Sequence, residues 1–181
     1  MNEAAREAET RRPGASYHEA AHAVFAYHRG EPIDHVMVGE DSEYESRVRF
    51  MLGDLASTTR VVAGKLAGKY AEELAATGKA REPIPYEELS KGFEQVMRTK
   101  TWPAGFELDE WQAFFILLRS LGRQKAEVAY RVASVYAAKH VELWWSEIDA
   151  LAKRLLELGR VEGSEVKPIM ETARGSKAER V

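Results

Sequence analysis

A His-Glu-x-x-His motif, formed by His18, Glu19 and His22, is the sequence feature that most constrains the fold. Two histidines four residues apart lie on one face of an α-helix, so both imidazoles can reach one metal ion only if this segment is helical. The residues between and after the histidines are mostly alanine or larger apolar residues, which predicts a largely buried helix over 17–28. Histidines and a glutamate in such a helix need polar or metal partners, so the motif predicts a metal site.

The chemistry that this motif suits is hydrolysis at a zinc ion. Zinc lowers the pKa of a bound water to about 7, which makes hydroxide available at neutral pH. Glu19, beside the first ligand, can take a proton from the attacking water and later pass it to the leaving amine. A random arrangement of 5 histidines and 29 acidic residues in this chain would give the motif only about 0.02 times. Coincidence is therefore a poor explanation.

A catalytic zinc ion usually has three protein ligands, and the third one here must offer nitrogen or oxygen because the chain has no cysteine. His28 would extend the motif to the metzincin pattern, but Phe25 stands where that pattern has glycine. Without the glycine the helix should continue, which puts His28 about 15 Å along the axis from His18. We therefore expect His28 to lie near the helix C-terminus without binding the metal, and His35 and His140 to have no metal role.

The third ligand is then expected to be a carboxylate. The residues considered are Glu72, Glu73, Glu88, Glu107, Asp109 and Glu110. Most acidic residues on helices are solvated surface residues, so their positions in the sequence select none of them.

The periodicity of the chain predicts a mainly α fold with one small β-hairpin after the motif helix. Pro13 and Gly14 are expected to end a polar N-terminal helix, and Ser16 to cap the motif helix. The expected helices span about 2–11, 17–28, 54–77, 86–98, 108–121, 125–158 and 163–172, and the two strands of the hairpin span 33–38 and 46–52.

Composition narrows the class of protein. The chain has 181 residues, 45% of them hydrophobic and 30% charged, which suits a single globular domain over 1–181. Within it we expect an N-terminal arm over 1–14 and a frayed tail over 174–181. The net charge of −3 and the mixed charge pattern argue against nucleic-acid binding. No apolar stretch approaches the roughly 20 residues needed to cross a bilayer, so we expect a cytoplasmic protein without membrane insertion.

Several segments resemble, in order, the peptidase domain of FtsH, the membrane-anchored ATP-dependent zinc protease. They are the motif helix at 17–23, the strand-like segment at 32–38, Leu-Ala-Gly-Lys-Tyr-Ala-Glu-Glu-Leu at 66–74, Gly-Phe-Glu-Leu-Asp-Glu-Trp-Gln-Ala at 105–113, and the segments 151–156 and 161–166. The resemblance covers about residues 16–170. It implies a helical zinc-peptidase fold in which Asp109 joins His18 and His22 as the third zinc ligand. Glu73 is the alternative third ligand. Ala21 and Ala67 replace glycines of that family, and residues 73–109 form a longer connection than the family has.

The resemblance implies a zinc metallopeptidase, with Glu19 as its general base, that hydrolyses peptides or unfolded proteins. The expected hairpin over 33–52 could hold substrate as an added strand. The chain has no phosphate-binding glycine loop, so such an enzyme would act without its own ATPase, either alone or with a separate ATPase partner. The resemblance also implies self-association into a homo-oligomer.

Two alternatives to a peptidase stay open. A non-enzymatic binding or assembly module of the same fold is one, and one of the adjacent Trp144 and Trp145 could then lie in an interface. A zinc hydrolase that acts on non-peptide amides is the other.

Overall fold

The structure is a computed structural model, and it describes residues 3–38, 55–79, 85–99 and 108–178. In chain order the elements are α1 (Glu3–His28), β1 (His35–Met37), α2 (Leu55–Thr77), α3 (Tyr86–Thr99), α4 (Leu108–Leu143), α5 (Trp145–Leu158), β2 (Arg160–Glu162) and α6 (Gly163–Ala178). The prediction of a mainly α fold is confirmed. The described residues also form a two-stranded antiparallel sheet, but it pairs β1 with the distant β2 and is not the predicted hairpin. Among the described residues, no helix is both long and apolar enough to cross a membrane.

The chain divides into two compact units. The first contains Met1–Val48, Ala67–Arg81 and Lys139–Val181, and the second contains Arg49–Leu66 and Glu82–Ala138. Helices α2 and α4 therefore each contribute residues to both units. The single domain expected over 1–181 stays a prediction.

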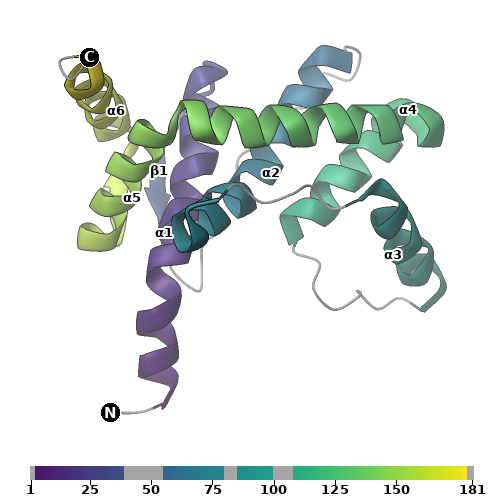
Figure 1. Cartoon of the computed structure of the whole chain (residues 1–181), viewed down its shortest axis with the longest axis horizontal. Coiled ribbons are helices and arrows are strands. Elements are labelled where there is room, and N and C mark those ends of the chain that lie inside the picture. Colours follow the sequence, from purple (N-terminus) through teal and green to yellow (C-terminus); the bar gives the residue numbers. More distant parts are fainter. Residues whose placement is uncertain (1–2, 39–54, 80–84, 100–107, 179–181) are drawn as a thin grey trace. The chain divides into compact units, whose positions relative to one another are not determined.

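The first unit is built on the motif helix. Helix α1 packs on α5, and α5 packs on α6 (Figure 1). The contact face of α1 is made of small side chains, with Ala20, Ala21 and Ala23 fully buried, so neighbouring backbones can approach closely. Helix α5 buries Leu151 and Leu155, and each such side chain stabilises the packing by roughly 1.5–3 kcal/mol. The motif histidines thus stand on a helix whose position is fixed by its core.

The break predicted at Pro13 and Gly14 is wrong, because α1 runs through both residues. Proline removes one backbone hydrogen bond, a loss that tertiary contacts can offset. Gly14 is close to α2: a β-carbon built on Gly14 would lie only 3.1 Å from Oε1 of Glu72. Ser16, expected to cap the motif helix, is instead a helical residue that is only 1% exposed.

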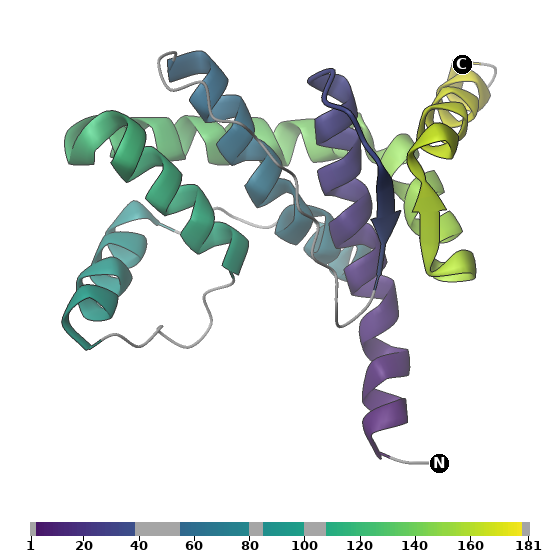
Figure 2. The same ribbon diagram turned by 180° about the vertical axis from the view of Figure 1, so that it is seen from behind.

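The sheet joins the segment after α1 to the segment after α5. Strand β1 pairs antiparallel with β2, with Val36 opposite Val161 (Figure 2). Both valines are buried at 1% exposure. Gly163 follows β2 directly and donates its N–H to the Asp34 carbonyl oxygen at 2.7 Å. The strand expected at 46–52 lies outside the described residues, and β2 is a strand that the sequence pattern does not predict.

The second unit contains α3, the start of α2 and most of α4. Its buried aromatic residues include Trp111, Phe114 and Tyr130. Exposed ion pairs join α3 to α4: Arg131 reaches Glu87 at 3.2 Å, and Arg123 of α4 reaches a second acid of α3. Such exposed pairs contribute little stability, at most about 1 kcal/mol each.

Two predicted helix limits differ from the structure. The gap expected between 121 and 125 is a kink inside α4, where Gly122 has φ 71°. The helix expected over 125–158 is interrupted at Trp144, so that it forms the end of α4 and α5. The sequence has no glycine or proline near Trp144 to signal this break.

The tail expected to fray from Arg174 is helical as far as Ala178, and its fraying stays a prediction. Helix α6 continues to Ala178, and the Arg174 guanidinium is hydrogen-bonded to Glu147 of α5 through Nε at 2.6 Å. Residues 179–181 of the predicted tail lie outside the described part of the chain.

Candidate metal centre

The two motif histidines converge on one point. Their Nε2 atoms lie 3.1 Å apart, and the rings meet edge-on with centroids 4.7 Å apart and planes at 85°. The helical spacing of four residues produces this arrangement, as predicted. His22 is 8% exposed, and the His18 side chain is 17% exposed. Two imidazole nitrogens this close either share a proton or bind one cation.

The pair has the geometry that zinc requires. Two nitrogen ligands at about 2.0–2.1 Å in a tetrahedral site are separated by about 3.3 Å, close to the observed 3.1 Å. Imidazole nitrogens, which His18 and His22 offer, are also common zinc donors. The residues present therefore fit a zinc ion.

Helix α2 approaches the histidines through a glycine. A β-carbon built on Gly68 would lie only 2.6 Å from His18 Nε2 and 2.7 Å from two ring carbons. Glycine inside a helix costs about 1 kcal/mol relative to alanine, so a mid-helix glycine often has a packing reason. Here the reason is the His18 ring. No role is predicted for Gly68 from the sequence, although a glycine inside an otherwise favourable helix is a signal of close packing.

Glu72, one turn further along α2, faces the other nitrogen of the same ring. Its Oε2 lies 3.8 Å from His18 Nδ1, an electrostatic contact rather than a short hydrogen bond, and 3.2 Å from Lys69 Nζ. The interaction with His18, followed by that with Lys69, lowers the pKa of Glu72 to about 2, although partial burial opposes the shift. A carboxylate beside Nδ1 favours the tautomer that leaves Nε2 free to bind a metal. Glu72 thus contacts a motif histidine from the side opposite the shared point.

The residue before the motif fixes the rotation of α1. Tyr17 donates its hydroxyl to Asp149 Oδ1 of α5 at 2.8 Å and stacks on Trp145 at 5.3 Å. Burial, and then the hydrogen bond to Asp149, raise the pKa of Tyr17 to about 12. Glu19, the predicted general base, is a half-buried residue of the same helix. Since neighbouring residues on a helix point about 100° apart, anchoring Tyr17 also sets the directions of His18 and Glu19.

Asp109, the predicted third ligand, lies in the first turn of α4 in the second unit. Its carboxylate is mostly buried and pairs with Lys65 of α2, with 3.6 Å between Oδ1 and Nζ. Of the other acids considered, Glu110 is buried and Glu88 is exposed on α3. Glu107 lies outside the described residues.

His28 belongs to a different polar cluster. Its Nε2 lies 2.8 Å from Oε2 of the buried Glu147, and its ring stacks on Trp144 at 3.8 Å. Arg174 adds two hydrogen bonds to Glu147, at 2.6 and 3.0 Å. His28 therefore ties the end of α1 to α5 and α6 at a position remote from His18 along the helix.

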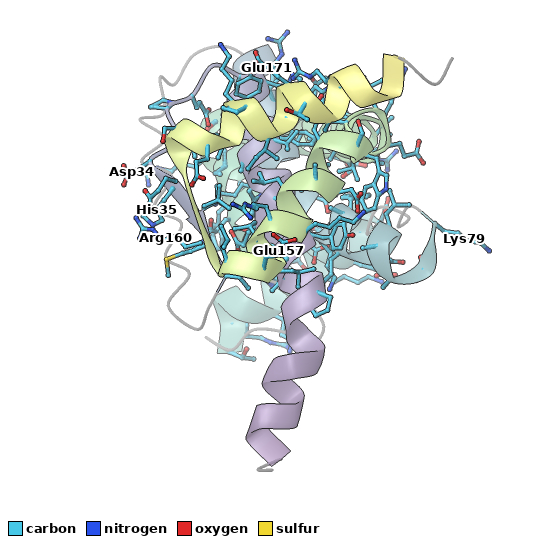
Figure 3. All side chains as sticks on the ribbon, turned by 90° about the vertical axis from the view of Figure 1, so that its left-hand side faces the viewer. Asp34, His35, Lys79, Glu157, Arg160 and Glu171 are labelled. Atoms are coloured by element: carbon cyan, nitrogen blue, oxygen red, sulfur yellow. The ribbon has the colours of Figure 1, made fainter. Side chains whose placement is uncertain are left out.

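The remaining two histidines have structural contacts. His140 meets Trp144 edge-on at 4.6 Å. His35 of β1 lies on the same side of the molecule as Asp34 and Arg160 (Figure 3), and its Nδ1 is 3.1 Å from Asp34 Oδ2. Neither contact involves a motif residue.

Comparison with protein-family models finds no match to the chain, and comparison with curated proteins finds none either.

Proposed function

We propose that the chain is a zinc-dependent metallopeptidase in which His18, His22 and Asp109 hold the metal and Glu19 is the general base. The observation that carries the proposal is the 3.1 Å separation of the two Nε2 atoms on a helix that also bears Glu19. Asp109 enters the proposal through the resemblance to the FtsH peptidase domain. Peptides or unfolded protein segments are the proposed substrates.

A bound zinc ion would supply hydroxide at neutral pH and polarise the substrate carbonyl. Glu19 accepts the proton of the attacking water as the new carbon–oxygen bond forms. The same carboxyl group then donates this proton to the amine nitrogen while the carbon–nitrogen bond breaks. Glu72 holds the His18 ring in place through both steps.

The test combines metal analysis with proteolysis. Wild-type protein should bind one zinc ion per chain and cleave unfolded casein, and His22→Ala should lose both properties. Glu19→Gln should keep the zinc and lose the cleavage, because the amide cannot accept the proton. Cleavage by Glu19→Gln at the wild-type rate would contradict the mechanism.

Two further results would redirect the proposal. Stoichiometric zinc in Asp109→Ala would move the third ligand elsewhere, with Glu73 tested next. A wild-type protein that binds zinc but cleaves neither casein nor peptides would favour the binding-module alternative, and activity on small amides alone would indicate a non-peptide amide hydrolase.

A further inference from the structure

Lys65 is a mostly buried cation beside a proposed metal ligand. Its side chain is 21% exposed, and its Nζ lies 3.6 Å from Oδ1 of Asp109, whose side chain is 18% exposed. Lysine is among the residues least often buried, because its ammonium loses hydration that a partner must replace. Asp109 provides part of that replacement and keeps the ammonium next to its carboxylate.

The face of α2 that bears Lys65 also bears the groups that meet the motif. Positions 65, 68 and 72 are spaced by three and four residues and therefore share one face of the helix. Gly68 meets the His18 ring, and Glu72 meets its Nδ1. Lys65, Gly68 and Glu72 thus each contact a proposed metal ligand.

The ammonium has capacity beyond the pair with Asp109. It carries three N–H donors, and a single carboxylate oxygen at 3.6 Å leaves at least two of them for other acceptors. A mostly buried cation next to a proposed metal ligand is suited to stabilise negative charge that develops in acyl transfer.

We propose that Lys65 is a catalytic residue of this site, the donor that stabilises the carbonyl oxygen of the substrate as it becomes an oxyanion. The inference rests on the proposed function. When the attacking water adds to the carbonyl carbon, the π electrons of the C=O bond move to oxygen, and Lys65 Nζ–H donates a hydrogen bond to it. When the carbon–nitrogen bond breaks, those electrons re-form the C=O bond, and Lys65 keeps its proton throughout.

The test separates charge stabilisation from support of Asp109. Lys65→Met keeps most of the apolar stem and removes the charge, and Lys65→Arg keeps the charge. Zinc affinity by chelator competition is measured together with kcat and KM on a fluorogenic peptide. Lys125→Met, at an exposed lysine of α4, is the matched control.

We expect Lys65→Met to lower kcat by about 10²–10³-fold with little change in KM. Its zinc affinity should equal or exceed that of wild type, because a positive charge near the cation has been removed. Lys65→Arg should recover most of kcat, and Lys125→Met should behave as wild type.

A Lys65→Met protein with kcat within threefold of wild type would overturn the proposal. Parallel loss of zinc affinity and kcat would also overturn it, since that pattern marks a residue that only supports Asp109. Both outcomes presuppose an active wild type. Absence of peptide cleavage by zinc-loaded wild type would instead overturn the proposed function, and this inference with it.

Discussion

Replacing Gly68 with alanine should damage the metal centre while leaving the fold intact. The new β-carbon would lie 2.6 Å from His18 Nε2, about 1 Å closer than the optimum for such a contact. The atoms it meets belong to a side chain, so the His18 ring can move away without shifting the backbone. That movement takes Nε2 away from the point it shares with His22.

The size of the effect follows from the cost of overpacking. Inserting one methyl group into a tight contact costs about 1–3 kcal/mol. If that cost falls on the metal-bound state, zinc affinity should drop by about 10- to 100-fold, since 1.4 kcal/mol is a factor of ten. The gain in helix propensity, about 1 kcal/mol, should keep the melting temperature of the metal-free protein near the wild-type value.

Gly175 provides the matched control, because it lies in helix α6 and a β-carbon there would meet no atom within 4 Å. Gly175→Ala should leave zinc affinity unchanged and raise stability slightly. Zinc affinity is measured by chelator competition. The position of the His18 ring is monitored through the NMR signals of the histidines in the metal-free protein. Wild-type zinc affinity and unshifted His18 signals in Gly68→Ala would refute the reasoning.

Three further predictions concern the first unit. Gly163→Ala should destabilise the protein by on the order of 3 kcal/mol in urea unfolding, because its β-carbon would overlap the Ile33 carbonyl oxygen; wild-type stability would show that this backbone contact is not tight. Glu147→Gln should cost about 1–3 kcal/mol by leaving Arg174 without its charged partner, and a neutral effect would mean that solvent replaces that partner. Tyr17 has a raised pKa, so the folded state holds the phenol proton more tightly than the unfolded state. Its contribution to stability should be present below pH 10, fall as the pH rises toward 12, and disappear in Tyr17→Phe; an unchanged alkaline transition in that variant would contradict this assignment.

The motif helix was predictable because its chemistry and its periodicity agree. A spacing of four places His18 and His22 together on any straight helix, whatever surrounds them. The mainly α fold was predictable for the same reason, since the apolar periodicity of α2 and α4 is local. The left-handed Gly122 falls where the sequence predicted a gap.

The features that the sequence did not predict depend on partners far along the chain. Helix α1 continues through Pro13, and the following residue, Gly14, lies against Glu72. Glu72 comes 58 residues after Gly14 in the chain. Strand β2 has three residues and is defined by its pairing with β1 rather than by any apolar alternation. The contact of Glu72 with His18 also could not be predicted from residue spacing. The sequence of residues 66–74 does not indicate whether Glu72 or the adjacent Glu73 faces the histidine.

The pairing of β1 with β2 has a consequence for the order in which the protein forms. The strands are more than 120 residues apart, and α1 packs on α5, which follows residue 144. During synthesis the motif histidines are therefore made well before α5, the helix that packs against their segment. Contacts this distant in sequence form slowly, since a long loop must close before they are gained. The arrangement of His18 and His22 against their packed surroundings can therefore be completed only after α5 has been synthesised.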